Sequence, residues 1–275
     1  MRKNEILTAF FIAKKNIIKN KNSLLFTILI ISLGFISSII IYGVLQDVSY
    51  DLQENFIETN MGHVILEPYE NQDKIENVGN VVEKIKILPN ILGVAKITKK
   101  SARIYDEDEN YIDTQILVIN PKEFSEVSVI DNIIEKGDFL YNGENDKILL
   151  GCVNVESCNE IKAFDTIKLD VGEKARIVSN GYPETFLTLK GIYDHRYIEI
   201  EATSYINEET AKAIFSDYDS TKADQIIILL PEREYAGETI EELSKMNLNV
   251  KISGWEEKSS KFSSVVDSFT IIGNI

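Results

Sequence analysis

The sequence predicts an α+β domain attached to one N-terminal transmembrane helix. Three observations lead to this prediction. Residues 24–45 contain no charged side chain, and the residues after them alternate between short β-type runs and helical periodicities. Two of the β-type runs flank a short polar loop, as in a hairpin. Strands and helices mixed in this way favour an α+β fold over a doubly wound parallel sheet.

The first expected element is a basic amphipathic helix within residues 1–23. Ile6, Phe10, Ala13 and Ile17 recur at helical spacing, and lysines occupy the remaining surface. A basic amphipathic helix beside a membrane span usually lies along the inner leaflet, with its lysines toward anionic lipid. We therefore expect a cytoplasmic segment whose partner is the lipid bilayer.

The second expected element is a transmembrane helix at residues 24–45. A helix of this length is roughly 33 Å long, enough to cross the hydrocarbon core. A cleavable signal peptide would have an apolar core of about 7–15 residues and a small-residue cleavage site, neither of which fits. A buried core helix would show one polar face. The small and hydroxylated positions suit either a helix–helix contact or simple tolerance by lipid: Thr27, Ser32, Gly34, Ser37 and Ser38.

Charge is distributed unevenly about this apolar run. Six lysines and arginines and one glutamate precede it, giving +5, while the whole chain carries −15. Residues 46–275 therefore carry −20, which disfavours nucleic acid as a partner. Basic residues close to a span remain in the cytoplasm. We expect a protein of the cell membrane with a cytoplasmic N-terminus and an extracytoplasmic main domain.

Residues 46–258 are expected to form this extracytoplasmic domain. A helical stripe continues past the span and ends at Gly62. The expected strands are residues 63–67, 94–105, 111–119, 147–150, 166–171, 175–178, 185–192, 225–230 and 249–252. The expected helices are residues 75–88, 208–215 and 239–246, with a loop or short helix at 121–129. A final helix at residues 259–275 is expected to lead into a truncated second transmembrane span.

The two cysteines, Cys152 and Cys158, are separated by five residues. An exported location permits a disulfide, and the count is even. A bridge closing so short a loop would contribute roughly 2 kcal/mol. The alternative is a pair of buried free thiols, which the neighbouring valines would also suit. A zinc site requires about four ligands, and no histidine is nearby in the sequence, so we expect no metal.

Motifs for catalysis are missing from the sequence. It contains no phosphate-binding loop, no H-E-x-x-H and no G-x-S-x-G. The two histidines, His63 and His195, lack a nucleophile or metal pattern and are expected to be structural. The acidic residues 106–109 lack the ligand spacing of a calcium loop, so a solvated hairpin turn is expected. We therefore expect no catalytic, cofactor-binding or metal-ligating residues, and a protein that is not an enzyme.

Four segments carry a resemblance to a known family. They are residues 13–21, residues 62–66 (Gly-His-Val-Ile-Leu), the pieces within residues 133–169, and residues 253–257 (Ser-Gly-Trp-Glu-Glu). Their order and spacing resemble the N-terminal two-thirds of the MacB-like ABC transporter permeases, which include FtsX and the lipoprotein-releasing LolC/LolE type. Each motif is degenerate: Phe164 stands where the family has glycine, and Gly254 where it has threonine.

The resemblance implies an ABC transporter permease subunit, or an N-terminal fragment of one, for export or lipoprotein release. Its MacB-like core domain would move with the transmembrane helices. The implied partners are a cytoplasmic ABC ATPase, which would bind ATP, and a second permease copy or a complementary permease half. The family has three further spans after the exported domain, whereas this sequence reaches Ile275 within the first turns of the second. We therefore expect a truncated or split permease.

Two other functions remain open from the sequence. The first is a single-span, membrane-anchored extracellular protein that binds a ligand or partner. The second is an anchored exported hydrolase, which the missing motifs disfavour.

Overall fold

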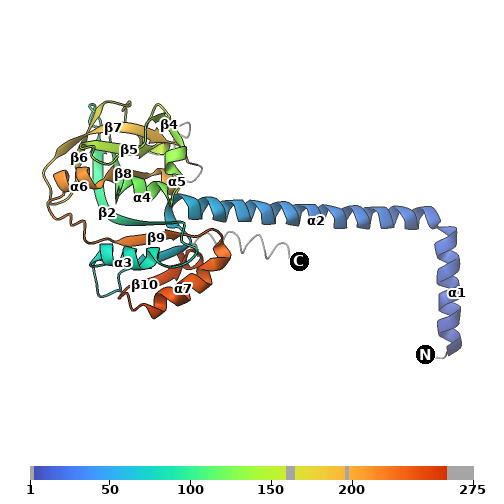
Figure 1. Ribbon diagram of the computed structural model, residues 1–275. Helices are drawn as coiled ribbons and strands as arrows, with labels where there is room; N and C mark the ends of the chain where they lie inside the picture. The colour runs from blue at the N-terminus through green and yellow to red at the C-terminus, as the bar shows by residue number, and fades with distance from the viewer. Residues whose placement is uncertain (1–2, 159–164, 196–197, 259–275) are drawn as a thin grey trace. The chain divides into compact units, whose positions relative to one another are not determined.

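The computed structural model describes residues 3–158, 165–195 and 198–258. The chain divides into two compact units: Met1–Gln53 with Lys261–Ile275, and Glu54–Ser260, called the body below. The predicted helix at residues 259–275 lies outside the described residues. Figure 1 shows the helices and strands of both units, with labels where there is room.

The N-terminal unit is built of helices. Helix α1 (Lys3–Lys19) ends at a turn at Asn20, and helix α2 (Lys21–Phe56) follows. Within α2, the stretch Lys21–Asp47 contains an 18-residue window with a mean hydropathy of 2.7, so it is long and apolar enough to cross a membrane. It is the one such helix among the described residues.

Three hydroxyl groups of the apolar stretch are satisfied within the helix itself. The side chains of Thr27, Ser37 and Ser38 each donate a hydrogen bond of 2.9–3.0 Å to the carbonyl oxygen four residues earlier. Polar groups in lipid must find such internal partners, because no water is present to bond them. These three side chains therefore do not require a neighbouring helix as a hydrogen-bond acceptor.

The body contains one ten-stranded mixed sheet, in the order β10-β1-β9-β2-β3-β8-β5-β7-β4, with β6 paired to β2 and β7. The β3–β8 and β5–β7 ladders are parallel, and the other described ladders are antiparallel. This mixture confirms the predicted α+β fold class. The strands are β1 (Val64–Glu67), β2 (Gly93–Tyr105), β3 (Tyr111–Ile119), β4 (Ile134–Gly137), β5 (Lys147–Gly151), β6 (Lys174–Val178), β7 (Thr185–Tyr193), β8 (Thr203–Asn207), β9 (Gln225–Leu229) and β10 (Lys251–Gly254).

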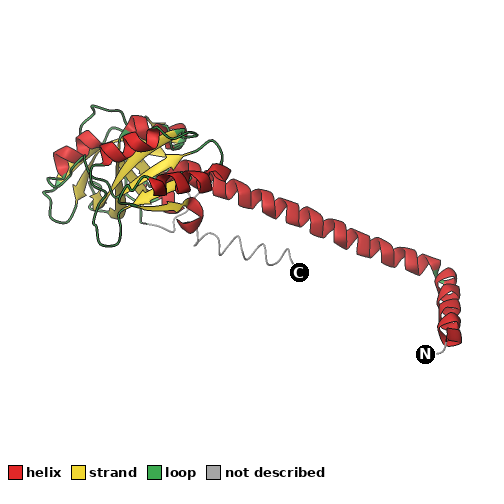
Figure 2. Cartoon of the chain, turned by 60° about the horizontal axis from the view of Figure 1, so that its bottom comes forward, coloured by secondary structure: helices red, strands yellow, loops and turns green. Residues whose placement is uncertain are grey.

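Short helices flank the strands of the body (Figure 2). They are α3 (Val78–Lys86), α4 (Pro121–Ser125), α5 (Ile198–Glu201), α6 (Glu208–Ile214), α7 (Ala236–Lys245) and α8 (Trp255–Lys258), with the 3₁₀ turns η2 (Ile130–Asn132), η3 (Cys152–Asn154) and η4 (Arg233–Tyr235). Asparagine residues cap the N-termini of two of these helices. Asn120 accepts from the first N–H groups of α4, and Asn207 accepts from Thr210 in α6. Such caps satisfy N–H groups that lack partners inside a helix.

Strand β2 connects two parts of the sheet. The smaller part contains β10, β1 and β9, and the larger part contains β3 to β8. Its first residues pair with β9, and its later residues pair with β3. A buried hydrophobic cluster joins the same two parts, because it contains Ile227 of β9, Phe124 of α4 and Tyr205 of β8. The rings of Phe124 and Tyr205 lie 5.5 Å apart. Since close-packed interiors transmit displacement rather than absorb it, we expect the body to move as one piece.

The sheet departs from the sequence prediction at several segments. The hairpin of β2 and β3 is confirmed, but strands β4 and β8 were not predicted. The strand expected at residues 166–171 is wrong: Ile167 forms only an isolated bridge with Val155. The N–H of Lys168 donates to the carboxylate of Asp106 at 2.9 Å rather than to a carbonyl oxygen of a neighbouring strand.

Candidate functional site: the attachment point of the body

The π-helix η1 (Ile57–Met61) leads the chain into the sheet and ends at Gly62. Gly62 has a φ of +61°, and a Cβ atom there would lie 2.5 Å from the carbonyl oxygen of Ile228. This position therefore requires glycine, both for its left-handed backbone and for space. The next N–H, of His63, donates to the same Ile228 oxygen at 2.8 Å. The chain is thus fixed to β9 immediately before β1 begins.

The chain leaves the sheet beside the place where it joins it. Strands β1 and β10 pair antiparallel, with Val64 opposite Gly254. The N–H of Trp255 then donates to the carbonyl oxygen of His63 at 3.1 Å. The residues 62–66 and 253–257, which the sequence analysis noted separately, therefore form one structural unit. We call this unit, together with η1, the attachment point.

His63 is buried at the attachment point, with 2% of its surface exposed. Its Nδ1 accepts from the N–H of Leu230 at 3.1 Å, which assigns the proton of the neutral ring to Nε2. Nε2 is buried and has no hydrogen-bond partner among the described residues. Burial lowers the pKa of His63, with a smaller opposing effect from Glu234. The neutral form of this histidine is therefore favoured.

The second histidine, His195, contacts η1 directly. Its Nε2 lies 3.0 Å from Oγ1 of Thr59. The Ser128 hydroxyl donates to the Thr59 carbonyl oxygen at 2.6 Å, and the Val129 N–H donates to the Glu58 carbonyl oxygen at 3.0 Å. Two loops of the larger part of the sheet thus bind successive residues of η1. Hydrogen bonds, and not apolar packing alone, fix this segment.

A carboxyl pair supports the loop that carries His195. The Glu201 side chain is 7% exposed, and its Oε1 accepts from the His195 N–H at 3.1 Å. Burial raises the pKa of Glu201 to about 7; the His195 N–H lowers it, and the adjacent carboxylate of Asp194 raises it further. Ionising Glu201 would place two negative charges beside each other at the base of this loop.

The structure pairs Cys152 and Cys158 as a disulfide with Cα atoms 5.2 Å apart. Sγ of Cys152 and carboxylate oxygens of Asp194 and Glu201 lie within 4.8 Å of one another. A thiolate is the form of cysteine that binds metal, and a bridged cysteine cannot supply it. The cluster therefore offers two carboxylates at most, and we assign no metal to it.

The acidic residues 106–109 form the turn between β2 and β3. Asp106 is buried and accepts from the N–H groups of Asn110 and Lys168, both at 2.9 Å. Burial raises the pKa of Asp106, but these hydrogen bonds outweigh it and the pKa is lowered. The carboxylate thus organises the turn, so the solvated turn that was expected is corrected at this residue.

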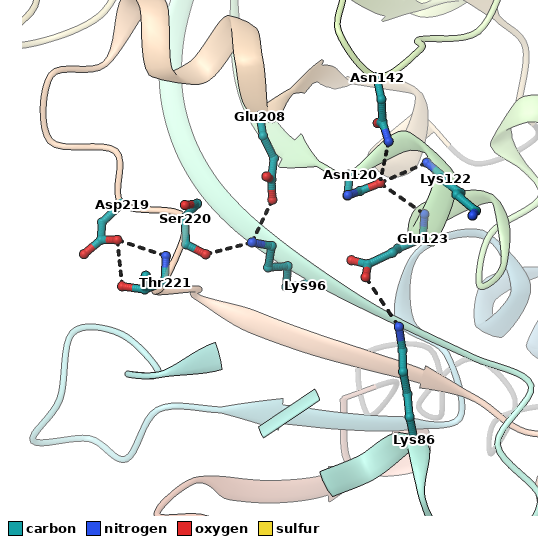
Figure 3. A network of polar contacts seen from close by, with 10 residues as sticks. All are labelled: Lys86, Lys96, Asn120, Lys122, Glu123, Asn142, Glu208, Asp219, Ser220 and Thr221. Carbon is teal, nitrogen blue, oxygen red and sulfur yellow. Dashed lines mark hydrogen bonds and ion pairs between the residues drawn. The ribbon is translucent and has the colours of Figure 1, made fainter. Parts of the chain in front are cut away.

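A pocket of about 390 Å³ lies between the N-terminal turns of α3 and α6 and helix α4 (Figure 3). On its wall, Lys96 of β2 reaches Glu208 at 2.7 Å and the Ser220 carbonyl oxygen at 2.7 Å. Glu123, which also lines the pocket, pairs with Lys86 at 3.4 Å. Its charges are therefore already compensated within the chain, which is typical of a structural network rather than a catalytic one.

Comparison with known proteins gives structural neighbours but no sequence relatives. No family model matches the chain, and no curated protein sequence matches it. The extracellular domain of the noncanonic ABC-type transporter YknZ from Gram-positive bacteria is similar, with 11% identity and a TM-score of 0.49, over 71% of this chain and 100% of that one. The periplasmic region of MacB from Actinobacillus actinomycetemcomitans has 11% identity and a TM-score of 0.48, over 74% and 94%.

A third neighbour is a domain assigned to a permease protein from Porphyromonas gingivalis. It has 13% identity and a TM-score of 0.39, over 71% of this chain and 87% of that one. The three neighbours are thus an extracellular domain of an ABC-type transporter, a periplasmic region and a domain of a permease protein.

The structure brings some of the sequence-predicted residues together and leaves others apart. His63 belongs to the attachment point and His195 contacts it through Thr59, although both were expected to be structural. Cys152 lies beside Glu201, which supports the His195 loop. Thr59, Ser128 and Glu201 were not singled out from the sequence. No local pattern marks them, because their partners are distant along the chain.

Proposed function

We propose that this chain is a permease subunit of an ABC transporter, or the N-terminal part of one, working in export or lipoprotein release. In this proposal a cytoplasmic ATPase binds and hydrolyses ATP. The permease chain passes the resulting movement through α2 to the extracytoplasmic body. The chain itself catalyses no reaction, and a second permease copy or complementary half completes the membrane part.

The observation that carries the proposal is the hydrogen bond between Trp255 and His63. The chain enters the body at β1 and leaves it at β10, and these two strands are paired. The chain segments before and after the body therefore connect to it at one place. A displacement of these segments would act on the sheet through β1 and β10 together. The buried cluster that joins both parts of the sheet would then carry the displacement to the whole body.

The proposed orientation rests on charge. The +5 segment before the apolar stretch favours a cytoplasmic N-terminus, and the −20 of residues 46–275 belongs to the exported side. It is tested in cells by introducing one cysteine, at Ser23 or at Tyr111, with the unsubstituted chain giving the background labelling of Cys152 and Cys158. A membrane-impermeant maleimide should label the Tyr111→Cys chain from outside and leave the Ser23→Cys chain unlabelled. The reverse pattern would contradict the orientation.

The main experiment is recovery of partners from the intact membrane. The full chain is purified in mild detergent through a tag after cross-linking in cells. An ABC ATPase, and a second permease polypeptide or copy, should be recovered with it. A matched control carries Gly62→Ala and Thr59→Val, which weaken the attachment point but leave α1 and the apolar stretch unchanged. Recovery of neither partner with the parent chain would overturn the permease proposal.

The second candidate function is a single-span, membrane-anchored protein that binds an extracellular ligand or partner. The single candidate span among the described residues favours it. In that case the same purification should recover an extracytoplasmic protein or ligand and no ATPase. The two candidates therefore predict different partners in one experiment.

A further inference from the structure

His63 connects the entry of the chain into the sheet with two other segments of the body. Its backbone N–H donates to the Ile228 carbonyl oxygen of β9 at 2.8 Å, and its carbonyl oxygen accepts from the Trp255 N–H at 3.1 Å. Its ring Nδ1 accepts from the N–H of Leu230 at 3.1 Å. One residue thus makes hydrogen bonds both where the chain enters the sheet and where it leaves.

The bond to Leu230 requires an uncharged ring. Nδ1 can accept a hydrogen bond only while it carries no proton, and a charged imidazole carries a hydrogen on both nitrogens. After protonation, the N–H of Leu230 would face another donor. Because Leu230 is 1% exposed, water could replace the lost acceptor only if the structure opened there.

The attachment point also contains polar atoms without partners. Nε2 of His63 and Oγ of Ser253 on β10 are buried, and neither has a hydrogen-bond partner among the described residues. Buried polar atoms of this kind cost free energy. A charged ring would add the cost of a buried cation that no carboxylate accepts from at Nε2. This part of the sheet is therefore poorly suited to a charged His63.

The surrounding charges do not offset a positive ring. Strand β9 contains no charged residue, and the residues that α7 buries are uncharged. Glu234 and Arg233 of η4 act on the pKa of His63 in opposite directions, and they pair with each other at 3.6 Å. Burial has a larger effect than either and lowers this pKa. Lys251 and Glu257 pair at 3.1 Å, and the other titratable side chains on the adjoining elements are Glu58 of η1, Glu67 of β1 and Glu256 of α8.

We propose that protonation of His63 opens the attachment point while the rest of the sheet stays folded. The ring would leave its place beside Leu230, and the backbone bonds from His63 to Ile228 and Trp255 would break with it. The buried cluster that contains residues of the β2–β3 hairpin includes no histidine, so it would keep its packing. Acid would therefore act first on the junction of β1, β9 and β10.

The opening itself does not depend on the proposed permease role, but its consequence for function does. With the attachment point open, the segments before and after the body would no longer be linked through β1 and β10. Movement of these segments would then reach the body less directly at acidic pH. Glu201 responds in the opposite direction, because burial raises its pKa and favours its protonated form. Acid therefore does not weaken the support that Glu201 gives to the His195 loop.

The experiment measures amide hydrogen exchange of the full chain in detergent, from about pH 5 to about pH 8. Protection factors, which correct for the intrinsic pH dependence of exchange, report local opening. Uptake of one proton on opening raises the opening constant by up to about 10-fold per pH unit below 6.5, the ordinary pKa of histidine. We expect protection at residues 62–66 and 228–230 to fall by up to this factor. Residues 111–119 of the β2–β3 hairpin should keep their protection.

Two variants assign the response to one of the two histidines in the chain. His63→Asn places an oxygen that does not titrate where Nδ1 accepts from Leu230, so it should remove most of the pH dependence. His195→Gln is the matched control: it replaces Nε2 with a neutral polar group and should keep the acid response. Hydrogen exchange at Cε1 of each ring, followed by mass spectrometry, measures the ring pKa values in the unsubstituted chain. His63 should titrate below its ordinary value.

Three results would contradict the proposal. The first is the same pH dependence of protection in His63→Asn as in the parent chain. The second is an ordinary pKa for the His63 ring, which also decides the case if His63→Asn loses protection at every pH. The third is loss of protection in the hairpin together with the attachment point, which would show global unfolding. None of these results concerns recovery of an ATPase, so the opening and the permease proposal can fail separately.

Discussion

The backbone N–H of Trp255 donates a hydrogen bond to the carbonyl oxygen of His63, at 3.1 Å, across a separation of nearly the whole body. Both residues belong to short motifs that are weak when considered alone. Their pairing gives the motifs a common physical role, since each forms one side of the attachment point. Substitutions there should therefore affect stability more than their small size suggests.

Gly62→Ala should destabilise the body by about 2 kcal/mol or more. The φ of +61° disfavours alanine, and the new Cβ would lie 2.5 Å from the Ile228 oxygen. The matched control is Gly79→Ala in α3, where a Cβ meets nothing within 4 Å. That change should be neutral or stabilising by up to about 1 kcal/mol. Thermal unfolding of the detergent-solubilised chain measures both, and equal effects would contradict the geometry.

Phe124→Ala should cost about 3–5 kcal/mol, because it empties space in the cluster that joins the two parts of the sheet. Phe186→Ala removes an equally large but exposed ring and should change stability by less than about 0.5 kcal/mol. Chemical denaturation of the two variants makes the comparison. Similar losses in both would indicate that the cluster does not hold the sheet together.

The stability contributed by Glu201 should fall as the pH rises through the interval from its ordinary pKa of 4.5 to about 7. In that interval the folded chain keeps a proton that the unfolded chain releases. Glu201→Gln mimics the protonated form, so its stability relative to the parent should increase between pH 4.5 and pH 8. Asp194→Asn should reduce this pH dependence. Comparing each variant with the parent at the same pH cancels the opposite contribution of His63, whose lowered pKa favours stability above its ordinary value of 6.5. A pH-independent difference would contradict the assignment.

The pairing of Cys152 with Cys158 should protect both thiols from alkylation in the protein purified without reductant. Mass spectrometry without reductant should show no added label, and labelling of both cysteines after reduction. Cys158→Ser should cost roughly 2 kcal/mol, as expected for opening a short loop. Labelling of both cysteines before reduction would show free thiols instead.

The sequence predicted the elements whose apolar pattern and turn residues agree. The β2–β3 hairpin combines β-type runs with a polar turn, and Gly62 was expected to end the first long helix. Strand β8 could not be found this way: Thr203, Ser204 and Asn207 are polar, yet the whole strand is buried. Its Ser204 hydroxyl finds a partner on the neighbouring strand, in the 2.9 Å contact with the Thr114 hydroxyl. Such a strand is stable only in its tertiary context.

The candidate site was less predictable than the fold, for a similar reason. The contact between Thr59 and His195 joins residues 136 positions apart, and neither lies in a recognisable motif. The strand expected at residues 166–171 failed because the side chain of Asp106 replaced a strand as the backbone's partner. Periodicity reports which face of an element is buried, but it does not report which distant group will bond to it.

The pairing of β1 with β10 also bears on how such a body could be gained or exchanged. A domain whose two ends lie side by side can be inserted into a loop of another protein without stretching the host. The hydrogen bond from Trp255 to His63 joins the two ends of this body. The residues between His63 and Trp255 could therefore be exchanged as one unit, without changing how the rest of the chain passes through the membrane.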